Sequence, residues 1–157
     1  MDIRKAILKD VNALHTLLTG VQQMHADGRP DIFIGGTTKY THEQISNIVN
    51  NPLTPVYVAV DDKDNVIGYA FCSIDEEKGT NNLRPIKNFY IDDLCVQSEY
   101  RGKGIGKTLY NYVLGVAKEK GCYHLTLNVW HLNKNAVKFY EKLGMSPLKT
   151  TMEQIIK

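Results

Sequence analysis

The chain has 157 residues, of which 43% are hydrophobic and 23% are charged. This length favours a single domain over residues 1–157, and the composition excludes a disordered chain. Nineteen lysines and arginines against 17 acidic residues give a formal net charge of +2. That balance predicts no nucleic-acid surface and no anionic membrane surface, so an anion has to be bound by a local group of residues.

The cysteines, apolar runs and histidines of the chain do not form the patterns that are typical of secreted, membrane or metal-binding proteins. The three cysteines are an odd number without a C-x-x-C pair, which predicts free thiols. No apolar run approaches the roughly 20 residues of a membrane span, and the first five residues lack the apolar segment of a signal peptide. The five histidines lack the spacings of a zinc site, so no metal is expected. A cytoplasmic protein is the expectation.

The first third of the chain predicts one strand and two helices. The strand is expected over residues 3–6, and Asp10 is expected to cap a helix whose apolar residues recur every three or four positions. Gly28 ends this helix, and a polar loop follows. Thr41, with Gln44 three residues later, forms a capping box that begins a second, short helix.

The middle of the chain changes to the alternation of strands. Two apolar segments, 56–60 and 66–74, are joined by a polar turn and predict a hairpin. Residues 75–85 are polar and predict a loop. A further strand is expected over 89–96.

The last third predicts two helices, each followed by a strand. After a glycine-rich turn, the clearest amphipathic helix begins at residue 105 and ends at Gly121. A strand over 124–130, a helix over 133–143 and a final strand over 151–156 follow. This order predicts an α/β fold of the α+β type, with a mixed, mostly antiparallel, twisted sheet flanked by about four helices.

The glycine-rich turn before the first of these helices has the features of an anion site. Unpaired N–H groups at a helix N-terminus attract negative charge, and glycine lets a phosphate approach the backbone closely. An ordinary turn at a helix start is the alternative. The segment is Arg101, Gly102, Lys103, Gly104, Ile105, Gly106 and Lys107.

Two nucleotide-binding motifs come close to this segment and fail by one residue. A Walker loop would need glycine where Arg101 stands. A dinucleotide fingerprint that began at Gly102 would need glycine where Lys107 stands. The preceding strands also predict an antiparallel meander, which excludes repeated βαβ units and a P-loop hydrolase.

The segment resembles motif A of the GNAT superfamily of N-acetyltransferases, whose pattern is R/Q-x-x-G-x-G/A. Arg101, Gly104 and Gly106 occupy the three fixed places, after Leu94-x-Val96 on the preceding strand. A second stretch resembles the family's motif B, with methionine in place of its usual final phenylalanine. Its matching residues are Asn133, Ala136, Phe139, Tyr140, Gly144 and Met145.

The resemblance implies that the chain binds acetyl-coenzyme A as a co-substrate. The pyrophosphate would lie on the backbone N–H groups of residues 101–107, and the pantetheine arm would pair with the strand edge at Leu94 and Val96. In this family that strand splays from the next one and opens a slot for the thioester. The N–H of Val96 would then donate to the acetyl carbonyl.

The same resemblance implies roles on the last helix. Asn133, Ala136 and Tyr140 are spaced to share one helix face. Tyr140 resembles the general acid that protonates the departing thiolate, and Asn133 resembles a coenzyme contact, while the small Ala136 leaves room for a ligand. A core tyrosine with its hydroxyl at the rim is the alternative for Tyr140.

The general base is expected on the strand over 89–96. Strict alternation would place Asp92 on the same face as Leu94 and Val96, with Asp93 and Cys95 on the other. Asp92 is therefore the candidate base, either directly or through a water relay. Attraction of a cationic amine is an equal alternative for it.

Two residues at the end of the predicted hairpin, Glu76 and Glu77, are further candidates for the base. Cys95 would face away from the slot, so we expect direct acetyl transfer to a primary amine without a covalent acyl-enzyme. The polar stretch from His25 to Asp31 is a candidate for acceptor recognition, and its acids would favour a cationic amine.

The acceptor itself stays open between a small-molecule amine and a protein or peptide amine. A homodimer is an expectation that only the family carries. A CoA-binding or sensor module that transfers nothing is the alternative function on the same fold.

Overall fold

The computed structural model describes residues 1–156, and five strands within them form one sheet in the order β1-β2-β3-β4-β5. Neighbouring strands are antiparallel except β4 and β5, which are parallel. The predicted mixed, mostly antiparallel sheet is therefore confirmed. The strands are β1 Asp2–Lys5, β2 Val56–Val60, β3 Val66–Glu77, β4 Ile86–Val96 and β5 His124–Leu127.

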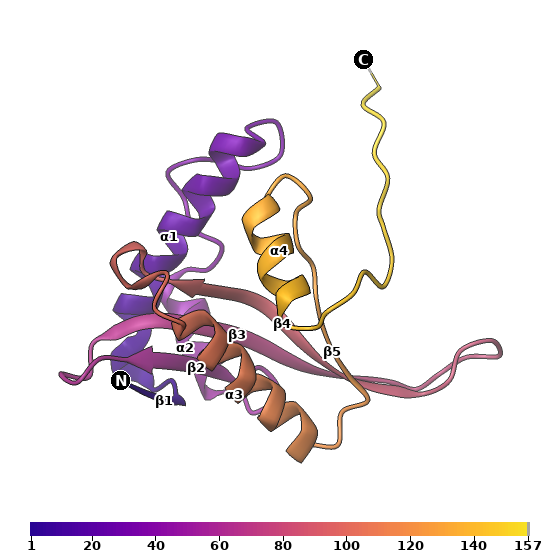
Figure 1. Cartoon of the computed structure of the whole chain (residues 1–157), viewed down its shortest axis with the longest axis horizontal. Coiled ribbons are helices and arrows are strands. Elements are labelled where there is room, and N and C mark those ends of the chain that lie inside the picture. The colour runs from indigo at the N-terminus through magenta and orange to yellow at the C-terminus, as the bar shows by residue number, and fades with distance from the viewer. Residues whose placement is uncertain (157) are drawn as a thin grey trace.

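Within residues 1–156, four α-helices cover the two faces of the sheet, with α1 and α2 on one face and α3 and α4 on the other (Figure 1). The predicted capping box begins α2, where the N–H of Gln44 donates to Thr41 Oγ1 at 3.2 Å. The helices are α1 Val11–Gly28, α2 His42–Asn50, α3 Ile105–Glu119 and α4 Lys134–Lys142, with 3-10 turns at Leu8–Asp10 and Ser98–Tyr100.

The central strands are apolar on both faces because helices cover both. In β2, Val56 and Val58 pack against the α1 and α2 side, whereas Tyr57 and Ala59 pack against the α3 side. All five residues of this strand are buried. A sheet with one wet face would instead show polar residues at every second position.

Asp10 stands at the start of α1, but its side chain does not cap the helix. Its carboxylate accepts hydrogen bonds from both terminal nitrogens of Arg4, at 2.7 and 3.0 Å, and from the N–H of Ile7 at 2.9 Å. The predicted cap is wrong because a buried carboxylate gains more from the Arg4 guanidinium of β1 than from a helix N–H group.

Several predicted strands differ from the structure in their bounds, and one is missing. Strand β3 continues to Glu77, three residues into the predicted 75–85 loop, and β4 begins at Ile86 instead of residue 89. The longer hairpin projects beyond the body of the sheet (Figure 1). Strand β5 ends at Leu127 instead of residue 130. Residues 151–156 form no strand and belong to an extended, exposed tail. Between Met1 and Ile156, no helix is long and apolar enough to cross a membrane.

Candidate active site

The glycine-rich turn connects the end of β4 to α3. Gly102 and Gly104 have positive φ angles of 75° and 81°, a conformation that side chains with a Cβ rarely adopt. Nothing lies within 4 Å of where a Cβ would stand on either glycine. Gly104 is the N-cap of α3, and no side chain accepts from the first turn. The turn therefore leaves open space in front of unpaired N–H groups.

Gly106 is a glycine for a different reason. A Cβ at this position would lie 3.3 Å from the ring tip of Phe139 and 3.7 Å from Val96 Cγ2. The absence of a side chain lets α3, α4 and the end of β4 approach closely. This third glycine of the motif therefore brings α4 next to the turn.

Three cationic residues surround the turn. Arg101 donates through Nε to the carbonyl oxygen of Val96 at 2.9 Å, so its side chain fixes the end of β4. Lys103 lies over the ring of Tyr100, with Nζ 5.1 Å from the centroid. Lys107 is exposed on the first turn of α3. Together they give the turn the local positive charge that the net charge conceals.

Strands β4 and β5 diverge beside this turn. Their parallel pairing ends at Ile91 and Leu127, whereas β4 continues to Val96. The N–H of Gln97 points to β3, where it donates to the Ile67 carbonyl oxygen at 2.9 Å. Because backbone groups alternate along a strand, those of Leu94 and Val96 point to the open side. A free strand edge thus leads to the glycine turn.

A β-bulge in β4 moves Asp92 off its predicted face, whereas Leu94 and Val96 lie on the face opposite Asp93 and Cys95 as predicted. Phe71 pairs with Asp93 and Cys72 pairs with Ile91, so Asp92 is an extra residue. Ile91 and Val96 both contact the α3 side, although five positions separate them. The prediction that Asp92 shares a face with Leu94 and Val96 is therefore wrong.

Asp92 faces the side of α1 and α2 and is already paired. Lys39 Nζ donates to Asp92 Oδ1 at 2.8 Å, and the Tyr40 hydroxyl donates to Oδ2 at 2.7 Å. Burial and this hydrogen bond raise the pKa of Tyr40. The carboxylate thus holds the segment before α2 against the sheet, and Lys39 already neutralises its charge.

Asp93, which was predicted to lie on the face opposite Leu94 and Val96, has the surroundings of a base. Its Oδ2 accepts from the Tyr69 hydroxyl at 2.9 Å, and no cation pairs with it among residues 1–156. Burial raises the pKa of Asp93, although the hydrogen bond from Tyr69 opposes that shift. The raised pKa of neighbouring Tyr69 has the same main cause, burial. The two adjacent acids could not be ranked from alternation alone because a bulge leaves no unique signal in a single sequence.

Tyr140 lies on α4, facing the α3 side of the sheet. Its ring is 6.4 Å from that of Tyr110 and 5.1 Å from that of Phe139, between ring centroids. Burial, the Asp93 charge and Tyr110 raise the pKa of the Tyr140 hydroxyl, which keeps it protonated near neutral pH. The side chain is half-buried, so it is not enclosed in the core.

The other two motif B residues begin the same helix. Asn133 is the N-cap of α4, and its Oδ1 accepts from the N–H of Ala136 at 3.1 Å. Asn133 therefore stands before the helix rather than on its face, and its amide NH₂ remains a donor. No residue of α4 is fully buried, which leaves one side of the helix open beside the diverging strands.

Glu76 and Glu77 lie on the projecting part of the hairpin and are exposed. Glu76 pairs with Lys87 at 3.5 Å. Four to five residues of extended strand separate them from the bulge, which is about 15 Å. The structure brings neither of them to the glycine turn.

The predicted acceptor segment is partly helical, because α1 continues to Gly28. His25 stacks on Phe33 at 5.0 Å, and Phe33 meets Trp130 edge-on at 5.0 Å. Trp130 is 41% exposed and thus lies outside the sheet core. Arg29 donates two hydrogen bonds to Asp31, at 2.9 and 2.7 Å.

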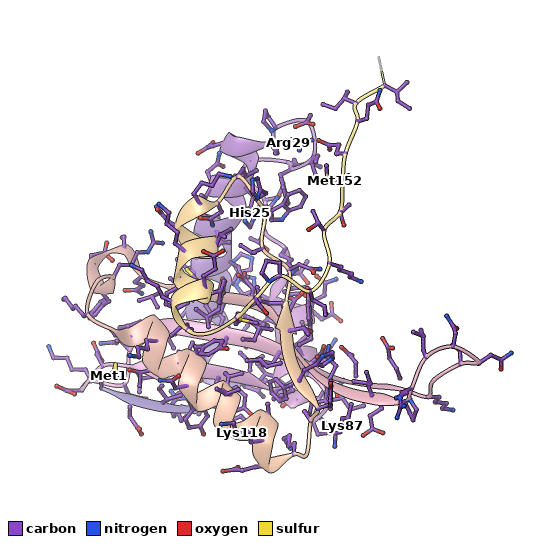
Figure 2. All side chains as sticks on the ribbon, turned by 45° about the vertical axis from the view of Figure 1, so that its right-hand side comes forward. Met1, His25, Arg29, Lys87, Lys118 and Met152 are labelled. Atoms are coloured by element: carbon purple, nitrogen blue, oxygen red, sulfur yellow. The ribbon has the colours of Figure 1, made fainter. Side chains whose placement is uncertain are left out.

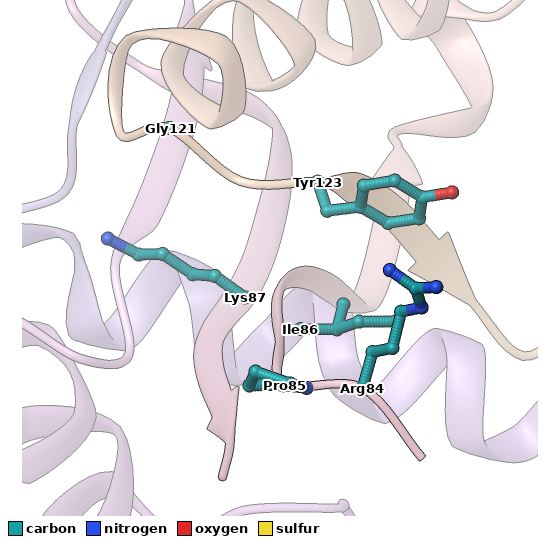
Figure 3. Close-up of a pocket in the computed structure, with 6 residues that line it drawn as sticks. All are labelled: Arg84, Pro85, Ile86, Lys87, Gly121 and Tyr123. Atoms are coloured by element: carbon teal, nitrogen blue, oxygen red, sulfur yellow. The ribbon is translucent and has the colours of Figure 1, made fainter. Parts of the chain in front are cut away.

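A surface hollow of about 450 Å³ lies elsewhere, between the base of the hairpin and the segment before β5 (Figure 3). Arg84 and Tyr123 point to the same side of it, and Lys87 points away. It includes none of the predicted site residues. Across residues 1–156, no three or more His, Cys, Asp or Glu side chains form a group suited to a metal ion.

A glycine-rich turn before a helix occurs in several folds, and comparison with known proteins decides which of them this chain has. Residues 21–145 match the sequence profile of the acetyltransferase (GNAT) family. The chain belongs to this family. Members of the GNAT family use acetyl-CoA.

Curated relatives of this GNAT chain act on different amines. The thialysine N-epsilon-acetyltransferase of Bos taurus is 34% identical over 115 residues, which are 72% of this chain and 60% of that protein. The peptidyl-lysine N-acetyltransferase YjaB of Escherichia coli is 31% identical over 93 residues, which are 59% of this chain and 50% of that protein. The chain thus spans about half to three-fifths of these relatives.

Solved GNAT-like structures extend the similarity to the whole chain. A mutant of the BH1408 protein from Bacillus halodurans has a TM-score of 0.96 at 29% identity, covering 100% of both chains. AAC(6')-Iy, in complex with a bisubstrate analogue that contains CoA, has a TM-score of 0.73 at 18% identity. At 18% identity, the similarity to AAC(6')-Iy shows only that the two proteins share a fold.

Proposed function

We propose that this GNAT chain is an acetyl-CoA-dependent N-acetyltransferase that transfers the acetyl group directly to a primary amine in a ternary complex. The observation that carries the proposal is the glycine turn at the end of β4, beside a free strand edge. The N–H groups and the three cations there suit a pyrophosphate, and the strand edge suits an amide-bearing arm.

The residues present fit acetyl-CoA. Gly102 and Gly104 leave open space, and any side chain there would intrude on a phosphate. Lys103 and Lys107 supply charge, Leu94 and Val96 supply backbone groups, and the Asn133 amide supplies a donor. When bound, acetyl-CoA supplies an activated acyl thioester. The remaining chemistry falls to the side chains around the bulge.

Three groups of the chain divide that chemistry. The Val96 N–H stabilises negative charge on the acyl oxygen. The Tyr140 hydroxyl supplies a proton to the thiolate. The Asp93 carboxylate, directly or through a water, takes the proton that the amine loses. Asp93 replaces Asp92 in this role because Lys39 and Tyr40 already occupy Asp92.

The acceptor is proposed as an unhindered primary amine on a small molecule or a peptide. The names of the relatives support both, since one acts on thialysine and another on peptidyl-lysine. The local charge favours cationic acceptors less than the sequence predicted. Arg29 neutralises Asp31, and Lys39 neutralises Asp92.

Binding and transfer are tested in two steps on the same preparation. Thermal shift is measured with acetyl-CoA, CoA and ATP, and thiol release is then measured against a panel of thialysine, lysine, polyamines, amino sugars and lysine peptides. Stabilisation by acetyl-CoA and CoA, with amine-dependent thiol release, is expected. Stabilisation by CoA with no release across the panel would favour a non-catalytic CoA-binding module. Stabilisation by ATP alone would overturn both functions.

A further inference from the structure

The side-chain amine of Lys39 lies where strands β4 and β5 separate. The parallel pairing of these strands ends at Ile91 and Leu127, and the point beyond these two residues is called the strand fork below. Asp92 is the next residue of β4, and its Oδ1 accepts a hydrogen bond from Lys39 Nζ at 2.8 Å. The chain therefore holds one of its own primary amines at the strand fork.

The neighbouring residue Tyr40 keeps Lys39 in this place. The Tyr40 hydroxyl donates to the other oxygen of Asp92 at 2.7 Å, and its ring lies 5.8 Å from that of Phe71, between centroids. Tyr40 also packs against the core on the α1 and α2 side of the sheet. Lys39 Nζ lies 5.5 Å from the centroid of the Tyr40 ring. An anchored tyrosine thus directs the adjacent lysine to Asp92.

The amine is held but still accessible. The side chain of Lys39 is 42% exposed, and that of Asp92 is 25% exposed. Lys39 belongs to residues 29–41, which form neither a helix nor a strand. Ion pairs near the surface contribute little to stability, and the lysine stem is flexible. Nζ can therefore leave Asp92 and turn toward the neighbouring Asp93 without unfolding any element.

The charge of Lys39 acts on Asp93, the residue proposed as the base. Burial raises the pKa of Asp93, and the positive charges of Lys39 and His25 oppose that shift. The charge of Asp93 in turn adds to the effect of burial in raising the pKa of Tyr140, the proposed acid. The amine, the base and the acid are thus close enough to influence one another.

The other lysines lie elsewhere. Within residues 1–156, Lys39 is the only lysine that forms an ion pair with a carboxylate of β4. Lys87 pairs with Glu76 on the projecting hairpin, and Lys118 is exposed near the end of α3. Figure 2 shows Lys87 and Lys118 well away from His25 at the α1 end of the molecule. Lys39 differs from them in its position, because exposure alone would not select it.

We propose that Lys39 is an internal acetyl acceptor, and that the chain acetylates itself at this residue when no other amine is bound. The inference rests on the proposed function, because it uses the same acetyl-CoA and the same side chains. It goes beyond that function by assigning a site of covalent modification on the chain itself.

The transfer uses the groups already described. The Lys39 ammonium gives one proton to Asp93, which passes it to solvent. The neutral nitrogen attacks the acyl carbon, so that a C–N bond forms and the C–S bond breaks. The thiolate takes the proton of Tyr140, and the remaining excess proton of the nitrogen passes through water to restore the tyrosine. The products are acetylated Lys39, the CoA thiol and one proton.

Acetylation of Lys39 would change the charge at the strand fork. It converts the ammonium into a neutral amide, which removes the partner of the ion pair with Asp92. Asp92 would then keep only the hydrogen bond from Tyr40. The modified chain would carry one more uncompensated negative charge beside the site, where a cationic acceptor would meet it.

Mass spectrometry tests the proposal on the full-length chain, incubated with acetyl-CoA in a buffer without primary amines. Lys39 is expected to be acetylated at least about tenfold faster than Lys118, because a positioned amine reacts as if it were highly concentrated. The rate per chain should not change on dilution of the protein, and excess CoA should suppress it. Equal rates at the two lysines, a rate that rises with protein concentration, or no effect of CoA overturns the proposal.

Two matched variants complete the test, with far-UV circular dichroism as the check that each is folded. Lys39→Arg keeps the positive charge but removes the amine, and it is expected to abolish the rapid acetylation. Lys118→Arg is expected to leave the acetylation of Lys39 unchanged. Amine-dependent thiol release by a wild-type chain whose Lys39 stays unmodified overturns this inference and leaves the proposed function standing. A chain that transfers acetyl neither to Lys39 nor to any added amine overturns both.

Discussion

Asp92 and Asp93 are neighbours on β4 with different surroundings, and the difference predicts different chemistry. Asp92 is in an ion pair with Lys39, whereas Asp93 is partly buried beside the hydroxyl of Tyr69 and forms no ion pair within residues 1–156. A base that works near neutral pH needs a pKa raised from the ordinary value of about 4 for an aspartate. Burial shifts Asp93 in that direction.

Asp93→Asn is expected to lower kcat on the order of 10²-fold, because it removes the group that takes the amine proton. In the wild type, activity should fall as pH falls through the raised pKa of Asp93, since the protonated carboxyl cannot act as a base. This acid limb should disappear in the variant. Asp92→Asn is the matched control and should keep the limb, because Asp92 is in an ion pair with Lys39 and does not take the amine proton. The reverse ranking of the two variants would contradict the assignment.

Tyr140→Phe is expected to lower kcat on the order of 10²-fold, with acetyl-CoA binding retained. The hydroxyl is the only group removed. Its raised pKa keeps it protonated, so it has a proton to donate to the thiolate. Stopped-flow measurement of thiol release checks the step itself. Cys95→Ala should be fully active, with no acetylated enzyme in the mass spectrum of the wild type. An unchanged rate of the chemical step in Tyr140→Phe would remove the tyrosine from the mechanism.

At the scale of elements, short sequence patterns predicted the structure correctly where a few neighbouring residues determine the backbone conformation. The glycines of the turn, the Thr41 capping box and the glycine stops all hold because backbone conformation decides them within a few residues. The face of β4 could not be predicted in this way. The bulge at Asp92 depends on how β3 and β4 align, which is a property of two strands together.

Gly104→Ala is expected to destabilise the fold by about 1–2 kcal/mol, because its φ of 81° is unfavourable for any residue with a Cβ. The added methyl should also raise KM for acetyl-CoA. Gly115→Ala is the control within the same helix, where nothing lies within 4 Å of the new atom. It should stabilise by about 0.5–1 kcal/mol. Urea unfolding and steady-state kinetics measure both, and a stabilised Gly104→Ala would refute the strain argument.

At the scale of the whole molecule, one buried ion pair joins distant parts of the chain. Arg4 of β1 contacts Asp10, which is 3% exposed, and also Asp64 in the turn between β2 and β3. Burial alone would raise the pKa of Asp10, but the hydrogen bonds from Arg4 and Ile7 outweigh it and lower the pKa. The ionised carboxylate is therefore favoured in the folded state.

Asp10→Asn is expected to lower the free energy of unfolding by about 2–3 kcal/mol at pH 7. A lowered pKa stabilises the fold above the unfolded value, and this contribution is lost as pH falls through the folded pKa. The difference between variant and wild type should therefore shrink in acid below pH 4. Asp62→Asn, at an exposed pair with the N-terminus, should change stability by less than about 0.5 kcal/mol. Chemical denaturation over a pH series measures both.

By itself, the sequence determined the order of elements, the glycine turn at residues 101–107 and the placement of Tyr140 on a helix beside it. Periodicity, capping and glycine conformation act within a few residues, and they suffice for these features. Only the tertiary structure decided that Lys39 pairs with Asp92 and not with Asp93, and that within residues 1–156 no strand pairs with residues 151–156. Strand register and the availability of a free edge depend on residues far apart in the chain, and no local pattern encodes them.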